Sequence, residues 1–396
     1  MAVKVSTSQA VAFRLNAHHL TKRAGLGGLL EAAGRCAIQN SPPGSALLAL
    51  HARVRDLTPE TMAAAIADEK SLLETWCMRG APFFFPTADA PVFTTGVLPP
   101  GEEAVRHFIP GVEPAIARLG ISLTEAVEWC GAEIHTVLSG RRLAINDLGQ
   151  ELARRIACRL TTAQRSIWDS EGPYAPNQPL GEGVVHFCVR ILTLQGIICL
   201  APRAGNQAPF VLVEEWLGRP IPDIRPEIAR AELLRRFLRC YGPSTRADFA
   251  AWLGVNAGDT GPWWNLVQEE LTPVEVERAS WILTEDLDTL RSAPQPEGVR
   301  LLPPRDPYTQ MQDRETIVDK KHHPELWKTA GEPGAVLVNG KIIGTWRPHK
   351  TGRKLNVTIR IFDAAPAPDR KLLQDEAQQV AALRGASYAD VVFASG

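Results

Sequence analysis

Three times along this chain, a group of helix signals is followed by a short stretch of alternating apolar and polar residues. The third group is the clearest: Pro226 can occupy the first turn of a helix, and Thr245-x-x-Asp248 can cap a shorter one. Thr272–Thr284 then alternates like a two-stranded hairpin. Short helices followed by a hairpin form the winged-helix arrangement, a relative of the helix-turn-helix. The alternative is an all-helical bundle with incidental hairpins.

The first two groups follow the same plan. Ser6-x-x-Gln9 and Ser122-x-x-Glu125 are capping boxes, each of which predicts the start of a helix. Apolar stretches on either side of Met78-Arg79-Gly80, and again at Ile197–Ala201 and Phe210–Glu214, indicate hairpins. The remaining helices are expected at Leu29–Ile38, Ala46–Val54, Leu148–Ile156 and Val184–Leu194.

Beyond a linker at Ser292–Gly298, the pattern changes to strands. Asn339-Gly340 is a strong hairpin signal, because both residues tolerate positive φ. Leu355–Phe362 alternates, and a helix at about Asp369–Leu383 precedes a strand at Tyr388–Phe393. We therefore expect an α+β protein: three winged-helix units, 1–115, 116–222 and 223–291, followed by a small β-barrel-like domain, 299–396.

The overall composition excludes several classes of protein. A net charge of −1 over 396 residues rules out a uniformly cationic nucleic-acid packager. The seven cysteines include no close pair, which fits reduced thiols and neither a disulfide framework nor a zinc knuckle. His322-His323 lack a third ligand at a zinc spacing, so we expect no metal and no cofactor. With no signal peptide and no apolar run near ~20 residues, we expect a cytoplasmic protein.

One segment of this nearly neutral chain is strongly basic. No acid stands between Glu332 and Asp363, and a local basic surface on a neutral protein is typical of a docking site for a polyanion such as DNA. Arg141 and Arg142 are further candidates for phosphate contact, although a solvated helix end explains them equally well. The expected DNA-binding residues in the basic segment are Lys341, Arg347, His349, Lys350, Arg353 and Lys354.

Acidic residues gather instead around the third hairpin, from Glu269 to Asp288. They would repel phosphate, so we expect the third unit to be structural or to face away from DNA. We expect Arg235, Arg236 and Arg239, on the first helix of this unit, to pair with nearby acids.

Two C-terminal motifs make the whole chain resemble one family. Leu301-Leu302-Pro303-Pro304-Arg305-Asp306-Pro307-Tyr308 and Gly344-Thr345-Trp346-Arg347 are similar to motifs of the AlkZ-like and YcaQ-like winged-helix DNA glycosylases. The resemblance implies a monofunctional, metal-free enzyme that removes bulky N7-alkylated purines, including interstrand crosslinks, from DNA.

The resemblance also implies a catalytic motif, Gln-x-Gln or Gln-x-Asp, at the end of a helix in the first unit. The matching residues here are Gln39 and Ser41, and the serine departs from the family pattern. An N7-alkylated purine is already a cationic leaving group, so the site must supply a positioned water and a dipole facing the sugar. A serine hydroxyl does this less well than an amide or a carboxylate. The alternative is that Gln39–Gly44 is only a polar helix end and turn.

Asn40 is expected to line a cleft, and so are Asp306 and Tyr308, between the β-barrel-like domain and the helices, although Pro-x-Asp-Pro is also a good turn. The rival function is a non-catalytic DNA-binding protein that recognises damage or regulates transcription. Because the chain shows no coiled-coil heptad, we expect a monomer.

Overall fold

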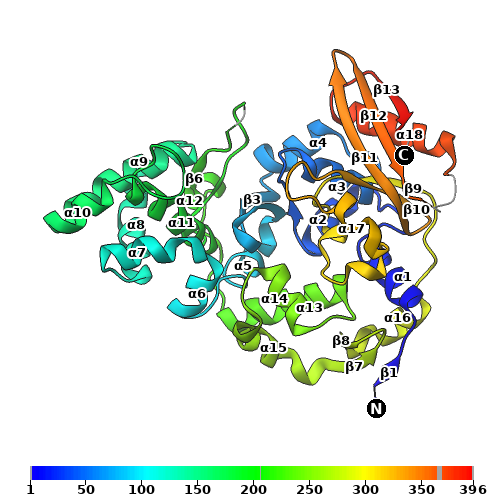
Figure 1. The fold of residues 1–396 in the computed structure, drawn as a ribbon, viewed down its shortest axis with the longest axis horizontal. Helices are drawn as coiled ribbons and strands as arrows, with labels where there is room; N and C mark the ends of the chain where they lie inside the picture. Colours follow the sequence, from blue (N-terminus) through cyan, green and yellow to red (C-terminus); the bar gives the residue numbers. More distant parts are fainter. Residues whose placement is uncertain (1, 206, 364–367, 395–396) are drawn as a thin grey trace.

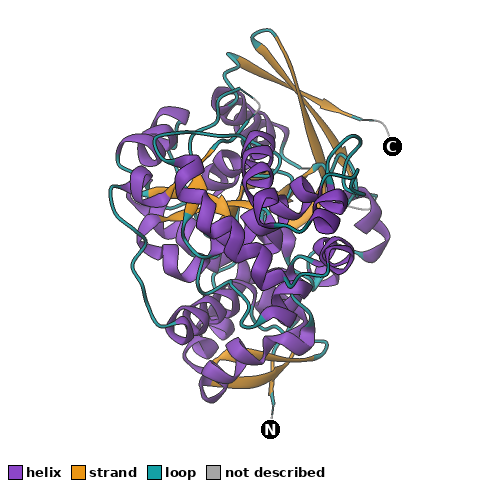
Figure 2. Cartoon of the chain, turned by 90° about the vertical axis from the view of Figure 1, so that its left-hand side faces the viewer, coloured by secondary structure: helices purple, strands orange, loops and turns teal. Residues whose placement is uncertain are grey.

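The computed structural model describes residues 2–205, 207–363 and 368–394 and shows a mixed α and β protein (Figures 1 and 2). In that part of the chain, no helix is both long enough and apolar enough to span a membrane. The helices are α1 Thr7–Ala17, α2 Leu29–Gly34, α3 Ser45–Arg53, α4 Pro59–Ala63, α5 Ala90–Phe93, α6 Glu102–Phe108, α7 Glu113–Leu119, α8 Leu123–Leu138, α9 Ile145–Ile156, α10 Thr162–Trp168, α11 Leu180–Leu194, α12 Val213–Leu217, α13 Pro226–Tyr241, α14 Arg246–Leu253, α15 Gly261–Val267, α16 Leu287–Ser292, α17 His323–Leu326 and α18 Arg370–Leu383. The strands are β1 Val3–Lys4, β2 Ile38–Gln39, β3 Leu72–Trp76, β4 Pro82–Pro86, β5 Ile198–Leu200, β6 Phe210–Leu212, β7 Leu271–Glu275, β8 Ala279–Leu283, β9 Val299–Leu302, β10 Gly334–Val338, β11 Lys341–Thr351, β12 Lys354–Ile361 and β13 Tyr388–Phe393.

The capping signals mark real helix starts. Ser6, Ser122 and Thr245 each accept a hydrogen bond from the backbone of the third helical residue, whose side chain bonds back to the cap. These three predictions are confirmed. The expected pairing of α13 arginines with acids is confirmed as well, by Arg235–Glu270, Arg236–Asp89 and Arg239–Glu285.

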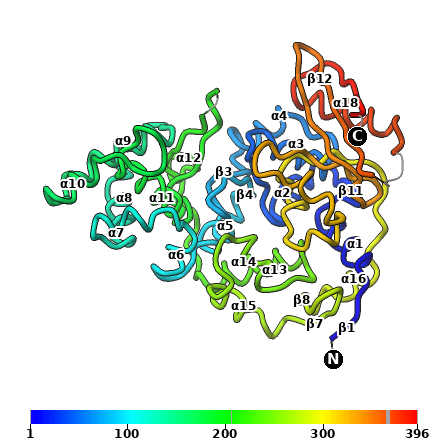
Figure 3. The backbone as a smooth tube through the Cα atoms, viewed as in Figure 1, coloured from blue at the N-terminus to red at the C-terminus, as the bar shows by residue number. Residues whose placement is uncertain are grey.

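The first two hairpins share one sheet of order β2-β4-β3-β5-β6. The junction is at Glu74 of β3, which pairs with Leu200 of β5. The helices α8, α9 and α11 pack together beside this sheet, and α11 contacts β3. The two hairpins therefore belong to one continuous sheet, and β3 and β4 lie near the centre of the molecule (Figure 3).

The prediction of a helix at Leu29–Ile38 is wrong for the residues after Gly34. Helix α2 ends at Gly34, Ala37 adopts a left-handed φ of 57°, and Ile38 and Gln39 form a strand paired with Phe84 and Phe83. Sheet pairing outcompetes helix propensity here, because β4 offers an open edge and the apolar Ile38 becomes fully buried. Gln39 thus lies on a strand, not at a helix end.

The C-terminal strands form a separate sheet of order β13-β12-β11-β10-β9, against which α18 packs. The Asn339-Gly340 turn lies between β10 and β11 as expected. In the described ranges the strand order leaves β9 and β13 as edges, so the expected closure into a barrel is not confirmed.

A buried ion pair joins this C-terminal region to α3. The Arg53 guanidinium donates to both carboxylate oxygens of Asp306, at 2.7 and 2.8 Å, and both side chains are at most 1% exposed. Tyr308 is likewise fully buried. The expectation that Asp306 and Tyr308 line an open cleft is therefore wrong: the first compensates a buried charge, and the second packs edge-on against His18.

Replacing Asp306 by Asn is expected to lower the free energy of unfolding by roughly 3–5 kcal/mol, because it leaves the Arg53 charge buried without a counter-charge. The measurement is the shift in denaturation midpoint by circular dichroism. Asp375→Asn is the control, since Asp375 pairs with Lys371 on the exposed face of α18 and its loss should change little. Equal midpoints for the two variants would contradict the role given to the buried pair.

Candidate functional site

Gln39 and Asn40, two neighbouring residues of the motif that follows α2, bond to different partners. Gln39 Oε1 accepts a hydrogen bond at 3.1 Å from Arg79 Nη2, and the other terminal nitrogen of Arg79 bonds to the carbonyl oxygen of Trp252 on α14. Gln39 is only 3% exposed. Its carbonyl oxygen is already occupied by the hydrogen bond from the Arg79 guanidinium.

Asn40 organises the loop that follows. Its Oδ1 accepts from the backbone nitrogens of Gly44 at 2.9 Å and Ala46 at 3.4 Å, which orients the amide so that Nδ2 faces the other way. Nδ2 donates to Glu74 Oε1 at 2.7 Å. Ser41 is half-buried in the same loop. Asn40 therefore links the loop to a carboxyl group that the sequence reading did not select.

Glu74 is a buried acid in the middle of the apolar strand β3. Its side chain is 4% exposed. Burial raises the pKa of Glu74 to about 7, although the Asn40 hydrogen bond and the charge of Arg203 oppose the shift. A carboxyl group with this pKa can give or take a proton near neutral pH, which is common in catalytic sites.

Asn40 and Glu74 line a pocket with a cavity volume of about 250 Å³. This is slightly below the range of roughly 300–1,000 Å³ typical of drug-sized ligands, and suits a group of nucleobase size. The walls are mostly apolar and come from α3, α4, the π-helical turn Ala64–Asp68, β4 and the residues after β5. The lining residues are Asn40, Gly44, Leu47, Met62, Ala63, Ile66, Ala67, Glu74, Phe84, Pro202 and Arg203.

Two hairpins rise on the same side of the molecule. In Figure 1 the β5–β6 pair and the long β11–β12 pair both point upward, with α4 of the pocket wall between them. The β11–β12 hairpin carries most of the basic residues expected to bind DNA. Arg347, His349, Lys350 and Arg353 are exposed on it, as is Lys341 at its start.

The charges on the β11–β12 hairpin are not all free. Lys354 Nζ lies 2.8 Å from Asp390 Oδ2 on the neighbouring strand β13, so an acid distant in sequence neutralises it. Arg347, Lys350 and Arg353 bond instead to neutral oxygens of Gly331, Arg384 and Ser387. Within the described ranges no carboxylate pairs with these three, so their charge is available to a polyanion.

Arg141 and Arg142 follow α8 and have local partners. Arg141 donates to the Val137 carbonyl and pairs with Glu151 at 3.3 Å. Arg142 stacks over the Trp216 ring, 5.5 Å from its centroid. These contacts favour the solvated helix end over a dedicated phosphate site.

Sequence reasoning missed Glu74 and Arg79, although a signal for the first was present. Leu72-Leu73-Glu74-Thr75-Trp76 places a charged residue on a face of the strand that is otherwise apolar. Arg79 has no comparable signal, because its contact with Gln39 depends on the pairing of β2 with β4.

Comparison with known proteins gives a consistent result. A family model described as DNA glycosylase AlkZ-like matches residues 33–383. The interstrand DNA cross-link repair glycosylase of Streptomyces sahachiroi is 25% identical over 356 residues, in an alignment that covers 85% of this chain and 86% of the relative. The solved structure of S. sahachiroi DNA glycosylase AlkZ has a similar fold, with a TM-score of 0.76 at 23% identity, covering 99% of this chain and 100% of that one.

The raised pKa of Glu74 has a measurable effect on stability. Between about pH 4.5 and pH 7 the folded protein keeps the Glu74 proton that the unfolded chain loses, so the free energy of unfolding falls as pH rises through this window. Replacing Glu74 by Gln should remove this loss, which is on the order of 3 kcal/mol, and make the variant more stable than the parent at pH 8. Urea denaturation of both proteins at pH 5 and pH 8 tests this. An unchanged pH dependence would show that Glu74 is ionised in the folded state throughout.

Proposed function

This chain belongs to the family of AlkZ-like DNA glycosylases, and we propose that it hydrolyses the N-glycosidic bond of bulky N7-alkylated purines in DNA. The name of its Streptomyces relative supports including purines that crosslink two strands. The observation that carries the proposal is the pocket beside Asn40, in which a carboxyl group stands among apolar walls.

In the proposed complex the alkylated base leaves the duplex and enters this pocket. Enzymes that act on a base extrude it and read it by stacking and by hydrogen bonds to its edge. Phe84 and Met62 supply apolar surface, and Glu74 supplies an acceptor. A cationic purine favours an ionised carboxylate, so its entry should lower the pKa of Glu74 and the pair should bind as opposite charges.

The Glu74 carboxylate also fits the chemical step. As the glycosidic bond breaks, positive charge moves from the purine to the sugar, and a fixed carboxylate stabilises that charge. The same group can take a proton from the attacking water. Glu74 would therefore supply the carboxylate that the Gln-x-Asp form of the family motif carries at the position occupied here by Ser41. Gln39 and Ser41 keep their proposed roles in placing the water, although the bond from Arg79 leaves Gln39 less free to do so.

The β11–β12 hairpin is the proposed contact with the DNA backbone. Its unpaired cations and the β5–β6 pair lie on the same side of the molecule as α4 of the pocket wall (Figure 1). We also propose the division into three winged-helix units, 1–115, 116–222 and 223–291, and a β-rich domain, 299–396, because each helical group ends in a hairpin. The third unit, rich in acids, is proposed to face away from DNA.

The central test is base release from duplex DNA that carries N7-methylguanine or a nitrogen-mustard crosslink. Glu74→Gln keeps the shape and an acceptor for Asn40 but loses the charge, so single-turnover release should fall by about 10²–10⁴-fold while affinity for undamaged DNA is retained. The parent's rate should rise with pH as Glu74 ionises, at a pH below the value of about 7 that holds without the bound cation, and the variant's should not. Abasic sites are counted by alkaline cleavage, with enzyme-free DNA as the background.

Gln39→Ala is the comparison for this experiment. A loss as large as that of Glu74→Gln, with stability and DNA affinity intact, would assign the step to the Gln39 amide and overturn the role of Glu74. If the unmodified protein binds the damaged duplex but releases no base at any pH, the non-catalytic alternative holds.

DNA affinity should depend on the hairpin cations. Replacing Arg347, Lys350 and Arg353 by Ala should weaken binding to any sequence and reduce the slope of log K against log salt by roughly 0.9 for each phosphate contact removed. Fluorescence anisotropy over a series of salt concentrations measures the slope. Lys354→Ala should change it less, because Asp390 already pairs with Lys354, and Arg235→Ala on the acidic third unit is the control. A slope unaffected by the triple substitution would show that these side chains do not contact phosphate.

A further inference from the structure

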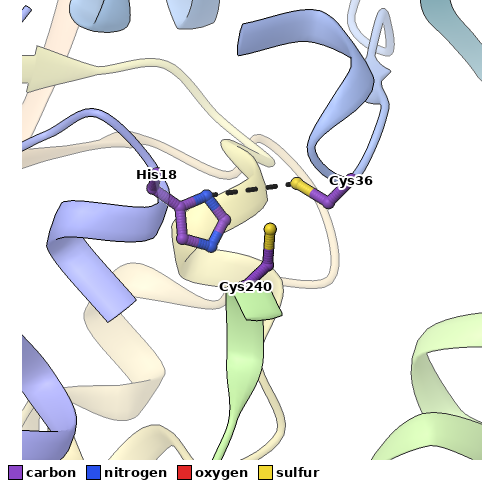
Figure 4. Close-up of side chains that lie close together, drawn as sticks. All are labelled: His18, Cys36 and Cys240. Carbon is purple, nitrogen blue, oxygen red and sulfur yellow. Dashed lines mark hydrogen bonds between the residues drawn. The ribbon is translucent and has the colours of Figure 1, made fainter. Parts of the chain in front are cut away.

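His18, Cys36 and Cys240 meet in the core, although they lie far apart in the sequence. His18 caps the C-terminal end of α1, Cys36 follows α2, and Cys240 belongs to α13 (Figure 4). All three are at most 2% exposed. Cys36 Sγ lies 4.0 Å from His18 Nδ1, and one donor atom from each residue lies within 4.8 Å of the others.

We propose that these three side chains bind a zinc(II) ion. Imidazole nitrogen and thiolate sulfur are the donors that zinc prefers, and two cysteines with one histidine are a known zinc ligand set. Metal–ligand bonds of roughly 2.0–2.3 Å place tetrahedral donors about 3.5–3.8 Å apart, so binding requires shifts of about 1 Å or less. The three protein donors fill three of the four tetrahedral positions.

An unpartnered nitrogen of His18 distinguishes a metal site from ordinary core packing. Buried cysteines often serve as small apolar residues, but an imidazole nitrogen buried without a partner is costly. His18 Nε2 is such an atom: within the described ranges no group bonds to it, and a zinc ion bound through this nitrogen would give it a partner. The side chain is held between Tyr241 and Tyr308, at ring-centroid distances of 5.1 and 5.7 Å, so it cannot turn toward solvent.

The charge balance also suits a divalent cation. Two thiolates and a neutral imidazole carry a charge of −2, which zinc(II) neutralises. Arg53, whose charge also acts on Cys36, is compensated by Asp306. His18 stands before the segment matched by the family model, residues 33–383, so this histidine lies outside the shared pattern.

A metal at this place would fix the geometry of the central sheet. Cys36 stands two positions before the short strand β2, and Cys240 lies on the helix that packs against α1 and α5. The ion would thus tie the N-terminal segment, the residues before the Asn40 loop and the third helical group to one point. Its role is structural and independent of whether the pocket cleaves DNA.

The test uses the full chain, purified without a histidine tag under a non-thiol reductant and dialysed against metal-free buffer. Elemental analysis should find about one zinc per chain. Replacing the zinc by cobalt(II) should give visible bands of tetrahedral cobalt and thiolate charge transfer in the near ultraviolet. Removing the metal with a strong chelator should lower the thermal unfolding midpoint, and zinc should restore it.

Cys36→Ser and Cys240→Ser should lose the metal, and Cys188→Ser is the matched control. Cys188 is also a buried thiol, beside Cys130, but outside the three-residue cluster. If the serine variants do not fold, the cobalt spectrum of the parent still reports thiolate ligands. A chain that contains no zinc and gives no thiolate-to-cobalt band, or metal that stays in Cys36→Ser, overturns the proposal, as does a Cys36–Cys240 disulfide in the purified protein.

Discussion

The ion pair between Arg53 and Asp306 holds together parts of the chain that would otherwise be separate. It joins the last turn of α3 to the segment after β9, and it does so where neither side chain contacts water. One face of α3 supplies Leu47 to the pocket, while Leu48 packs into the core of the C-terminal sheet. The pocket wall and the β11–β12 hairpin are therefore positioned by the same short helix. This helix sets the distance between the proposed catalytic pocket and the proposed DNA contact.

Local signals predicted the helices and hairpins well, because each rests on a few adjacent residues. The capping serines and Thr245, and the Asn339-Gly340 turn, act over three or four positions and need no partner from elsewhere. The strand at Ile38–Gln39 could not be found this way. It exists because β4 presents an open edge to it, and that edge is built from residues more than forty positions later.

In the candidate site too, the sequence identifies residues of a local motif but not the partners that come from distant strands. Asn40 belongs to the motif that the sequence identifies, but its partner Glu74 is found only once β3 lies beside β4. The basic segment at 341–354 is less positively charged in the fold than the sequence suggests. The segment itself contains no acid, but Asp390 pairs with Lys354 from the adjacent strand β13. Charge patterns along a sequence predict a surface only after the neighbouring strands are known.

The parallel pairing of β1 with β7 constrains the order in which the protein can assemble. Val3 and Lys4 pair with Val274 and Glu275, so β1 has no partner until the residues of β7 have been made. The hairpins at β3–β4 and β5–β6 can form during synthesis, but the N-terminal segment must wait. A chain that ended before β7 would leave the edge of β1, just before α1, without a partner strand. Completion of the fold is therefore coupled to completion of the third helical group. This acid-rich group has a structural role, the pairing of β7 with β1, that does not require contact with DNA.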